Sequence, residues 1–345
     1  MTRLANPKDS QPRLAVILPC HNEEVAIGHT ISGFRSALPD AEIYVYDNNS
    51  SDRTVEVARK AGAIVRSERR QGKGHVVRRM FADVDADIYI IADGDATYDC
   101  NAAPAMVARL IDDQLDMVVG SRVTNEKEAY RRGHKFGNAM LTGLLKTFFG
   151  QSFTDILSGY RVFSRRFVKS FPALSSGFEI ETEISVHALE MRMPVAEVTT
   201  QYSARPEGSV SKLSTYRDGW AILRVLFQLL RFEKPAIFFG SIGAVLFAAA
   251  IVLSVPLILT YMESGLVPRL PTAVIIIGLL IISALCVCCG LILDTVVRGR
   301  QEIKRLSYLA LPPVSAATSW APYLGVDQSR PAPLHSATGS LPLST

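Results

Sequence analysis

The sequence predicts an α/β domain with a mostly parallel sheet, followed by two membrane-spanning helices. Short apolar runs of strand length alternate with longer helical segments in the first third of the 345-residue chain. Alternation of this kind builds a parallel sheet with helices on both faces. Nearer the C-terminus, residues 235–262 and 270–293 carry no charged side chain. Each of these segments exceeds the roughly 20 residues that are needed to cross a bilayer.

Hydrophobic periodicity and flanking polar residues assign the elements of the first domain in order. Residues 14–18 form an apolar run of strand length that Pro19 follows. Residues 87–92 form an isoleucine-rich run, which is typical of a parallel strand buried on both faces. The predicted strands are 14–18, 42–46, 63–66, 87–92 and 117–119. The predicted helices are 23–37, 52–61, 74–84 and 103–114.

The rest of the chain divides at changes in composition. An amphipathic helix is predicted before the membrane, because Trp220, Leu223, Phe227 and Leu230 recur at helical spacing. The last 35 or so residues are rich in Pro, Ser and Ala, which is typical of disorder. The predicted divisions are a tail at 1–12, the α/β domain at 13–212, the amphipathic juxtamembrane helix at 213–234, a hairpin at 235–293 with spans 235–261 and 271–293, a cytoplasmic helix at 294–310, and a disordered tail at 311–345.

Positive charges beside the two spans predict their orientation. Arg231 and Lys234 precede the first span, and Arg298, Arg300 and Lys304 follow the second. Because such residues stay on the cytoplasmic side, both termini and the α/β domain are predicted to be cytoplasmic. No cleavable signal is expected, since the only apolar run near the start has the length of a strand. These features predict a multi-pass protein of the inner (plasma) membrane.

Several functional classes are disfavoured. No G-x-G-x-x-G motif follows the first strand, and the Gly-Lys-Gly at residues 72–74 lacks the rest of a Walker A loop. Dinucleotide dehydrogenases and P-loop NTPases are therefore disfavoured. The net charge of +4 is too small to indicate nucleic-acid binding. Five cysteines without a repeated C-x-x-C pattern disfavour a disulfide or zinc framework.

Asp93-Gly94-Asp95 follows the isoleucine-rich strand directly. Ligands of open α/β sheets bind beyond the carboxyl ends of the strands. Carboxylates suit Mg²⁺ or Mn²⁺, so this acidic pair can hold a metal that bridges a diphosphate. A lone D-x-D is equally typical of a solvated turn. However, polar loops at 22–24, 47–52 and 71–74 are predicted at the same edge of the sheet. A purely structural role for these turns does not readily explain why four of them, with the acidic turn included, gather there.

These loops carry a resemblance to a known family. Residues 18–24 (LPCHNEE), 47–54 (DNNSSDRT), 72–74 (GKG) and 93–95 (DGD) resemble the successive nucleotide-sugar loops of family-2 glycosyltransferases, which have the GT-A fold. Four later motifs resemble the subgroup that transfers sugars to polyprenyl phosphates, which includes dolichol-phosphate mannose and glucose synthases. They are residues 119–122 (VGSR), 155–161 (DILSGYR), 178–181 (FEIE) and 205–212 (RPEGSVSK).

The resemblance implies roles at the matched positions. The donor-binding residues that it implies are Pro19, Asn22, Glu23, Asp47, Asn49, Lys73, Asp93 and Gly94. Asp47 would accept hydrogen bonds from the nucleobase, and it could also cap the helix that begins near Asp52. Lys73 would bring a positive charge to the diphosphate. Asp93 and Asp95 would bind Mg²⁺ or Mn²⁺, with Asp95 as the direct ligand.

One departure from the family concerns the metal. Dolichol-phosphate mannose synthases usually continue the acidic motif with Leu-Gln, whereas Ala96 and Thr97 follow here. A glutamine contact to the metal is therefore absent, and either Thr97 or Asp99 is expected to take its place.

The resemblance also implies a cationic acceptor site. A phosphate monoester is already anionic near neutral pH, so the main task is to hold two anionic reactants together. The residues expected to bind the acceptor phosphate are Arg122, Arg131, Arg205 and Lys212, and the expected catalytic residues are Asp95, Asp155 and Arg122. Two roles stay open for Asp155. It resembles the position proposed as a base in related enzymes, or it orients Arg161 through a salt bridge.

The resulting functional hypothesis is inverting transfer of a hexose from a UDP- or GDP-sugar to a polyprenyl phosphate, either undecaprenyl or dolichyl phosphate. One alternative keeps the donor but uses a glycolipid or diacylglycerol acceptor. A second alternative is a non-catalytic, membrane-tethered sensor of nucleotide sugars. The expected partners are the nucleotide sugar, the polyprenyl phosphate lipid and the membrane. No nucleic-acid partner is expected, and assembly into a homo-oligomer is an open question at this point.

Overall fold

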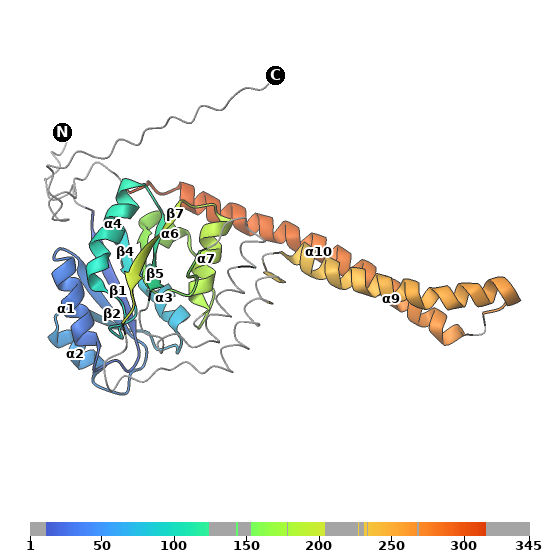
Figure 1. Ribbon diagram of the computed structural model, residues 1–345, viewed down its shortest axis with the longest axis horizontal. Coiled ribbons are helices and arrows are strands. Elements are labelled where there is room, and N and C mark those ends of the chain that lie inside the picture. Colours follow the sequence, from blue (N-terminus) through green and yellow to red (C-terminus); the bar gives the residue numbers. More distant parts are fainter. Residues whose placement is uncertain are drawn as a thin grey trace, which may run out of the picture.

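The computed structural model describes residues 12–123, 143, 153–177, 179–203, 227, 231–232, 234–267 and 269–314. An α/β domain lies at one end, and a long pair of helices extends away from it (Figure 1). The strands are β1 (Leu14–Cys20), β2 (Glu42–Asp47), β3 (Ile64–Ser67), β4 (Ile88–Ile91), β5 (Met117–Val123), β6 (Arg161–Ser164) and β7 (Val195–Gln201). They form one seven-stranded sheet in the order β3-β2-β1-β4-β6-β5-β7.

The direction of the strands decides where the polar loops meet. β6 runs antiparallel to β4 and β5, and every other neighbouring pair is parallel. The carboxyl ends of β1, β2, β4 and β5 therefore share one edge of the sheet. The chain enters β6 from this same edge, because Arg161 pairs with Ile91 of β4 and with Val119 of β5.

Helices cover both faces of the sheet. They are α1 (Ile27–Ala37), α2 (Thr54–Lys60), α3 (Lys73–Asp83), α4 (Ala103–Asp112), α6 (Arg165–Ser170) and α7 (Ile180–Glu190), with a short 3₁₀ turn, η2 (Cys100–Ala102). Phe34 of α1 and Met106 of α4 belong to the core on one face. Met80 of α3, Phe167 of α6 and Ile184 of α7 belong to the core on the other. The predicted alternation of strands and helices is confirmed.

One difference from the predicted elements lies at the start of α1. This helix begins at Ile27 rather than near residue 23. The backbone N–H groups of Glu23 and Glu24 donate instead to Thr54 Oγ1 (2.8 Å) and Asp52 Oδ2 (3.1 Å). These contacts hold the segment as a turn against the loop after β2. Four elements, β6, α6, α7 and β7, were not among those predicted.

Two long apolar helices follow the α/β domain. They are α9 (Pro235–Ser264) and α10 (Leu270–Leu309), and each is long and apolar enough to cross a membrane. They pack closely at Gly243, whose carbonyl oxygen accepts a hydrogen bond from Ser283 Oγ (2.8 Å). Most of their large apolar side chains point outward, as a lipid environment requires. Most of the predicted amphipathic helix at 213–234 lies outside the described residues.

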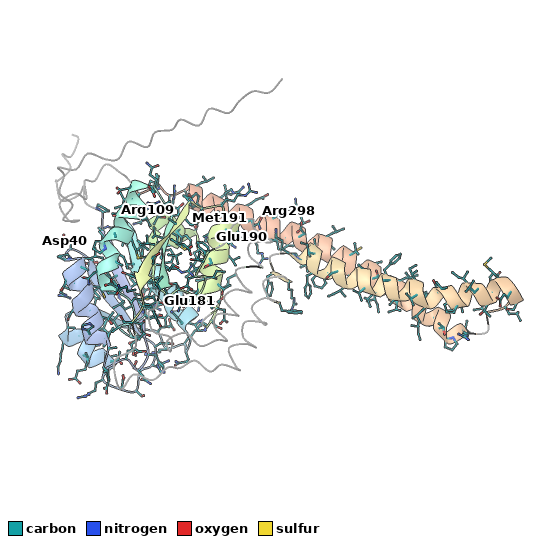
Figure 2. All side chains as sticks on the ribbon, in the orientation of Figure 1. Asp40, Arg109, Glu181, Glu190, Met191 and Arg298 are labelled. Atoms are coloured by element: carbon teal, nitrogen blue, oxygen red, sulfur yellow. The ribbon has the colours of Figure 1, made fainter. Side chains whose placement is uncertain are left out.

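Beyond its apolar part, α10 continues without a break and docks onto the α/β domain (Figure 1). Lys304 Nζ pairs with Glu190 Oε2 (2.7 Å), and the hydroxyl of Tyr308 donates to Asp116 Oδ2 (2.8 Å). Figure 2 shows Glu190 near α10, at the opposite end of α7 from Glu181. Asp116, which is fully buried, directly precedes β5. The segment predicted as a cytoplasmic helix is therefore part of α10, and it contacts the end of α7 and the residue before β5.

We expect Tyr308→Phe to loosen this junction, because Asp116 loses one hydrogen-bond donor. A lost hydrogen bond of a buried charged acceptor costs about 1–3 kcal/mol. Amide hydrogen exchange in α6 and in the last turns of α10 should therefore become at least about fivefold faster. Tyr261→Phe is the control, because Tyr261 is an exposed tyrosine of α9. Equal protection in the two variants would contradict the prediction.

Candidate active site

Hydrogen bonds join the loops after β1 and β2 at the sheet edge where the carboxyl ends of β1, β2, β4 and β5 meet. This edge is called the active edge. The backbone N–H of Asn22 donates to Ser50 Oγ (2.9 Å), and the N–H of Ser51 donates to Asn22 Oδ1 (2.7 Å). Asn22 has a positive φ of 53°, which asparagine tolerates better than most residues. Two of the predicted donor residues, Asn22 and Glu23, thus lie in a loop that is fixed by the neighbouring loop.

Asp47 ends β2 and is buried. Its carboxylate accepts a hydrogen bond from the backbone N–H of Ser50 (3.2 Å). Asp52, not Asp47, accepts from the N–H of Thr54 (3.0 Å) at the start of α2. The hydrogen bond at the start of α2 that was open for Asp47 is therefore made by Asp52, while Arg53 is the N-cap residue of this helix. Asp47 instead shapes the loop, and its nucleobase contact stays a prediction.

The next two residues connect this loop to the Gly-Lys-Gly segment. Asn48 donates to the carbonyl oxygens of Glu68 (2.9 Å) and Arg70 (2.7 Å), and its Oδ1 accepts from the N–H of Gly72 (2.7 Å). Asn49 donates to the carbonyl oxygen of Arg69 (2.9 Å). Asn48 was not among the predicted site residues. An asparagine in a polar loop carries no signal for such long-range contacts.

Gly72 and Gly74 allow a close approach of backbone. A Cβ atom at Gly72 would lie 2.2 Å from the carbonyl oxygen of Ser176, and one at Gly74 would lie 2.1 Å from that of Ser175. Gly72 also has a φ of +131°, a region that favours glycine. Glu183 of α7 holds the opposing segment, because it accepts from the N–H of Ser175 (2.7 Å). Gly72 and Gly74 thus allow the backbone on either side of Lys73 to pack directly against the segment at Ser175 and Ser176.

Lys73 is the first residue of α3, and its side chain is 10% exposed. Its Nζ lies 2.5 Å from Asp93 Oδ1 and 2.5 Å from Glu181 Oε1. Burial alone would lower the pKa of Lys73, but Asp93 and Glu181 outweigh that effect, so the pKa is raised. Lys73 was predicted to face a diphosphate. In this structure its charge is neutralised by two carboxylates.

The acidic pair follows β4 as predicted. Asp95 is 4% exposed, and its Oδ1 accepts a hydrogen bond from the hydroxyl of Thr97 (2.6 Å). Asp99 instead accepts from the N–H of Asn101 (2.9 Å), at the start of η2. Of the two candidates for the missing glutamine contact, Thr97 is therefore the one beside the acidic pair. A Cβ at Gly94 would lie 2.5 Å from Cys20 Sγ, so a larger residue here would have to displace the Cys20 side chain.

The described residues include no group of three or more His, Cys, Asp or Glu side chains that could hold a metal. Two carboxylates are nevertheless a suitable set for Mg²⁺ or Mn²⁺ at a phosphate site. Such ions commonly take one or two protein carboxylates and complete their coordination with phosphate oxygens and water. Asp93 and Asp95 thus fit a cation that arrives with a diphosphate.

Arg122 and Asp155 form a two-point ion pair at the same edge. Arg122 Nε lies 2.7 Å from Asp155 Oδ2, and its Nη2 lies 2.8 Å from Oδ1. The guanidinium also lies over the ring of Tyr202, 5.5 Å from its centroid. This planar arrangement fixes the direction of the guanidinium.

The alternative pair of Asp155 with Arg161 is wrong. Arg161 is fully buried and donates instead to the carbonyl oxygens of Ser158 (2.9 Å) and Ile156 (2.5 Å). It thereby holds the turn that leads into β6. Burial lowers the pKa of Arg161 to about 10, and an arginine of that pKa stays protonated at neutral pH.

Two residues that were not predicted complete the site. Glu181 is buried on the first turn of α7. It ends the FEIE motif at residues 178–181, but the sequence assigned it no role of its own, because an acid near a helix start is ordinary for a helix dipole. The hydroxyl of Tyr98 accepts a hydrogen bond from the N–H of Gly159 (2.9 Å). A Cβ at Gly159 would lie 2.8 Å from Asp93 Oδ2, so any larger residue here would have to displace the Asp93 carboxylate. The predicted acceptor residues Arg131, Arg205 and Lys212 lie outside the described residues.

Comparison with known proteins identifies the family. The profile of glycosyl transferase family 2 matches residues 15–171. Glycosyltransferase AglJ of Haloferax volcanii is 34% identical over 232 residues, which cover 67% of this chain and 76% of that protein. The chain belongs to glycosyl transferase family 2. Another protein of the same organism, a dolichyl-phosphate hexose transferase, is 29% identical over 221 residues, covering 64% of this glycosyltransferase and 95% of that protein.

A solved structure confirms the fold of this family-2 glycosyltransferase. Glucosyl-3-phosphoglycerate synthase from Mycobacterium tuberculosis, in complex with Mn²⁺, UDP and glucosyl-3-phosphoglycerate, superposes with a TM-score of 0.53. The match covers 64% of this chain and 79% of that chain at 22% identity. The predicted GT-A fold and the predicted family are both confirmed. The acidic pair, Lys73 and the Arg122–Asp155 pair therefore belong to a glycosyltransferase domain.

Proposed function

We propose that this glycosyltransferase transfers a hexose, with inversion, from a UDP- or GDP-sugar to a polyprenyl phosphate. The observation that carries the proposal is the fixed guanidinium of Arg122 at the same sheet edge as Asp93 and Asp95. Arg122 lies on β5 and pairs with Asp155, whereas the acidic pair follows β4, and a guanidinium placed in this way suits a second anionic reactant. The dolichyl-phosphate hexose transferase of H. volcanii supports the same class of acceptor.

Asp93 and Asp95 would hold Mg²⁺ or Mn²⁺, which would neutralise the diphosphate as it leaves the sugar. The remaining roles fall to side chains of this chain. Asn22, Glu23 and Asn49 lie on the joined loops after β1 and β2, and Asp47 is the last residue of β2. These four residues would bind the nucleoside, with Pro19 near the end of β1 as a wall.

Asp155 acts in this proposal as a positioning residue for Arg122. Both of its carboxylate oxygens accept hydrogen bonds from Arg122. A phosphate monoester has its second pKa near about 6, so it is largely deprotonated before it reacts and does not depend on a base. Arg122 would then orient the acceptor oxygen toward the sugar C1, and Arg131, Arg205 and Lys212 would add to the acceptor site.

The membrane part follows from α9 and α10. Both helices are apolar over the length of a bilayer, and α10 carries Arg298, Arg300 and Lys304 just beyond its apolar part. We place the α/β domain on the cytoplasmic face of the inner membrane, in a multi-pass protein. Docking of α10 on Asp116 and Glu190 would then keep the active edge at a fixed height above the lipid headgroups.

The test is incubation of the purified full-length protein with labelled nucleotide sugars and undecaprenyl phosphate. We expect a labelled lipid that mild acid releases, as a sugar phosphodiester should. Undecaprenol, which lacks the phosphate, is the control acceptor and should give no product. A product that resists acid, or equal use of undecaprenol or diacylglycerol, would favour the glycolipid alternative. Donor binding without transfer to any lipid would favour the sensor.

A further inference from the structure

Lys73 lies between one of the two predicted metal ligands and a carboxylate outside the metal site. Asp93 comes from the loop after β4, Lys73 from the start of α3, and Glu181 from the first turn of α7. Both carboxylates contact the same ammonium group. Figure 2 labels Glu181 within the α/β domain. A buried ammonium needs paired carboxylates, because removing it from water is unfavourable.

Glu181 has an oxygen that is able to accept a further hydrogen bond from Lys73. Its Oε1 contacts Lys73, while its Oε2 is buried and has no hydrogen-bond partner among the described residues. A small void lined by Lys73, Gly159, Arg161 and Glu181, together with apolar side chains, adjoins this carboxylate. The ammonium therefore has both an unused acceptor and space on the side of α7. Neither feature is explained by a fixed salt bridge alone.

Asp93 is in the opposite situation. Its Oδ1 contacts Lys73, and its Oδ2 lies so close to Gly159 that a Cβ there would be 2.8 Å away. A divalent cation that binds Asp93 must therefore share this carboxylate with Lys73 or displace Lys73 from it. Two cations at one carboxylate repel each other, and solvent screens this repulsion only in part, because the side chain of Lys73 is 10% exposed and that of Asp93 is 32% exposed. Displacement toward Glu181 removes that repulsion and keeps Lys73 paired.

We infer that Lys73 is the counter-ion of Asp93 when the donor is absent, and that Glu181 is the positioning residue that receives Lys73 when a divalent cation binds. This inference rests on the metal-dependent donor binding of the proposed function. Lys73 then keeps one carboxylate partner and directs its other N–H groups toward the diphosphate. Glu181 contacts neither metal nor donor and acts only through Lys73.

The inference predicts opposite effects for two substitutions. In Lys73→Met the competitor for Asp93 is gone, so Mn²⁺ should bind the donor-free protein about tenfold more tightly. UDP or GDP should bind about tenfold more weakly, because the diphosphate loses a cation. In Glu181→Gln the ammonium is confined to Asp93, so Mn²⁺ should bind about tenfold more weakly.

The double variant Lys73→Met/Glu181→Gln separates positioning from a merely structural role. It removes one charge of each sign, so it preserves the net charge of the site even if Lys73→Met alone fails to fold. Without Lys73 the effect of Glu181 should vanish, and Mn²⁺ should bind at least as tightly as to the unchanged protein. If Glu181 served only the fold, its substitution would weaken Mn²⁺ binding in both backgrounds. Glu190→Gln, at the other end of α7, is the matched control and should leave Mn²⁺ affinity unchanged.

The measurement is the paramagnetic resonance signal of free Mn²⁺, titrated with the full-length protein in detergent, first alone and then with UDP or GDP. No lipid acceptor is present, so an error in the proposed acceptor leaves the result unaffected. If the unchanged protein, the two single variants and the double variant all bind Mn²⁺ with equal affinity, the inference is overturned and the proposed function is not affected. Failure of the unchanged protein to bind Mn²⁺ even with UDP or GDP would overturn both the inference and the proposed metal dependence.

Discussion

Replacement of Asp95 by asparagine should reduce glycosyl transfer by on the order of a thousandfold, since a metal supplies several kcal/mol of transition-state stabilisation. Asp95 is buried beside Asp93, and asparagine removes the negative charge that a metal requires while keeping the shape of the side chain. Its amide oxygen can still accept the hydrogen bond from Thr97, so the turn after β4 should persist. Single-turnover transfer with saturating metal is the measurement.

Two controls accompany this prediction. Asp99→Asn should retain activity, because Asp99 bonds to the backbone of Asn101 at the start of η2 and not to the acidic pair. Excess EDTA should abolish glycosyl transfer by the unchanged protein, and added Mg²⁺ or Mn²⁺ should restore the transfer. Full turnover in EDTA would refute the metal site, as would an Asp95→Asn variant with normal turnover.

The second large effect is expected at Arg122. Lysine keeps the charge but cannot make the two-point contact with Asp155, so the cation loses its fixed direction. We expect Arg122→Lys to lower kcat/KM for the polyprenyl phosphate by about a hundredfold, or about 3 kcal/mol. The Kd for the nucleotide sugar should stay within about twofold, because Lys73 and the acidic pair are unchanged. Initial rates at varied lipid concentration and calorimetry with the donor measure the two quantities.

Arg109→Lys is the matched control for this substitution. Arg109 is an exposed arginine of α4 that pairs with Asp113 one turn later, and it can be located in Figure 2. Its replacement should leave both quantities unchanged. Asp155→Asn should reproduce most of the Arg122→Lys defect and add little to it in the double variant, since both act on one contact. Additive losses would show instead that Asp155 has a separate role, such as the base that the sequence left open.

The identity of the site loops was visible in the sequence because each motif is short and contiguous. DGD follows an isoleucine-rich strand, and the polar loops at 22–24, 47–52 and 71–74 follow or precede other predicted elements. Parallel strands bring their carboxyl ends to one edge, so strand order along the chain already places these loops together. The two apolar helices were equally readable, because a bilayer requires a long run of apolar residues.

Partners across long sequence separations were not readable in this way. Asp155 was given two possible roles, and its actual partner, Arg122, depends on the antiparallel pairing of β6 with β5. β6 itself was missed, because a strand of only four residues that begins with Arg161 and ends with Ser164 carries little periodic signal. Glu181 ends the FEIE motif, but only the packing of α7 showed that its partner is Lys73.

By itself, the sequence determined the strand and helix alternation, the acidic pair at a strand end and the two long apolar segments, because local periodicity and contiguous motifs encode them. Only the tertiary structure decided that Lys73 is shared by Asp93 and Glu181, and that α10 returns to the sheet through Tyr308 and Asp116. The physical reason is that these charged and polar groups are stabilised only when buried together. Which groups are buried together depends on the register and packing of segments far apart in the chain.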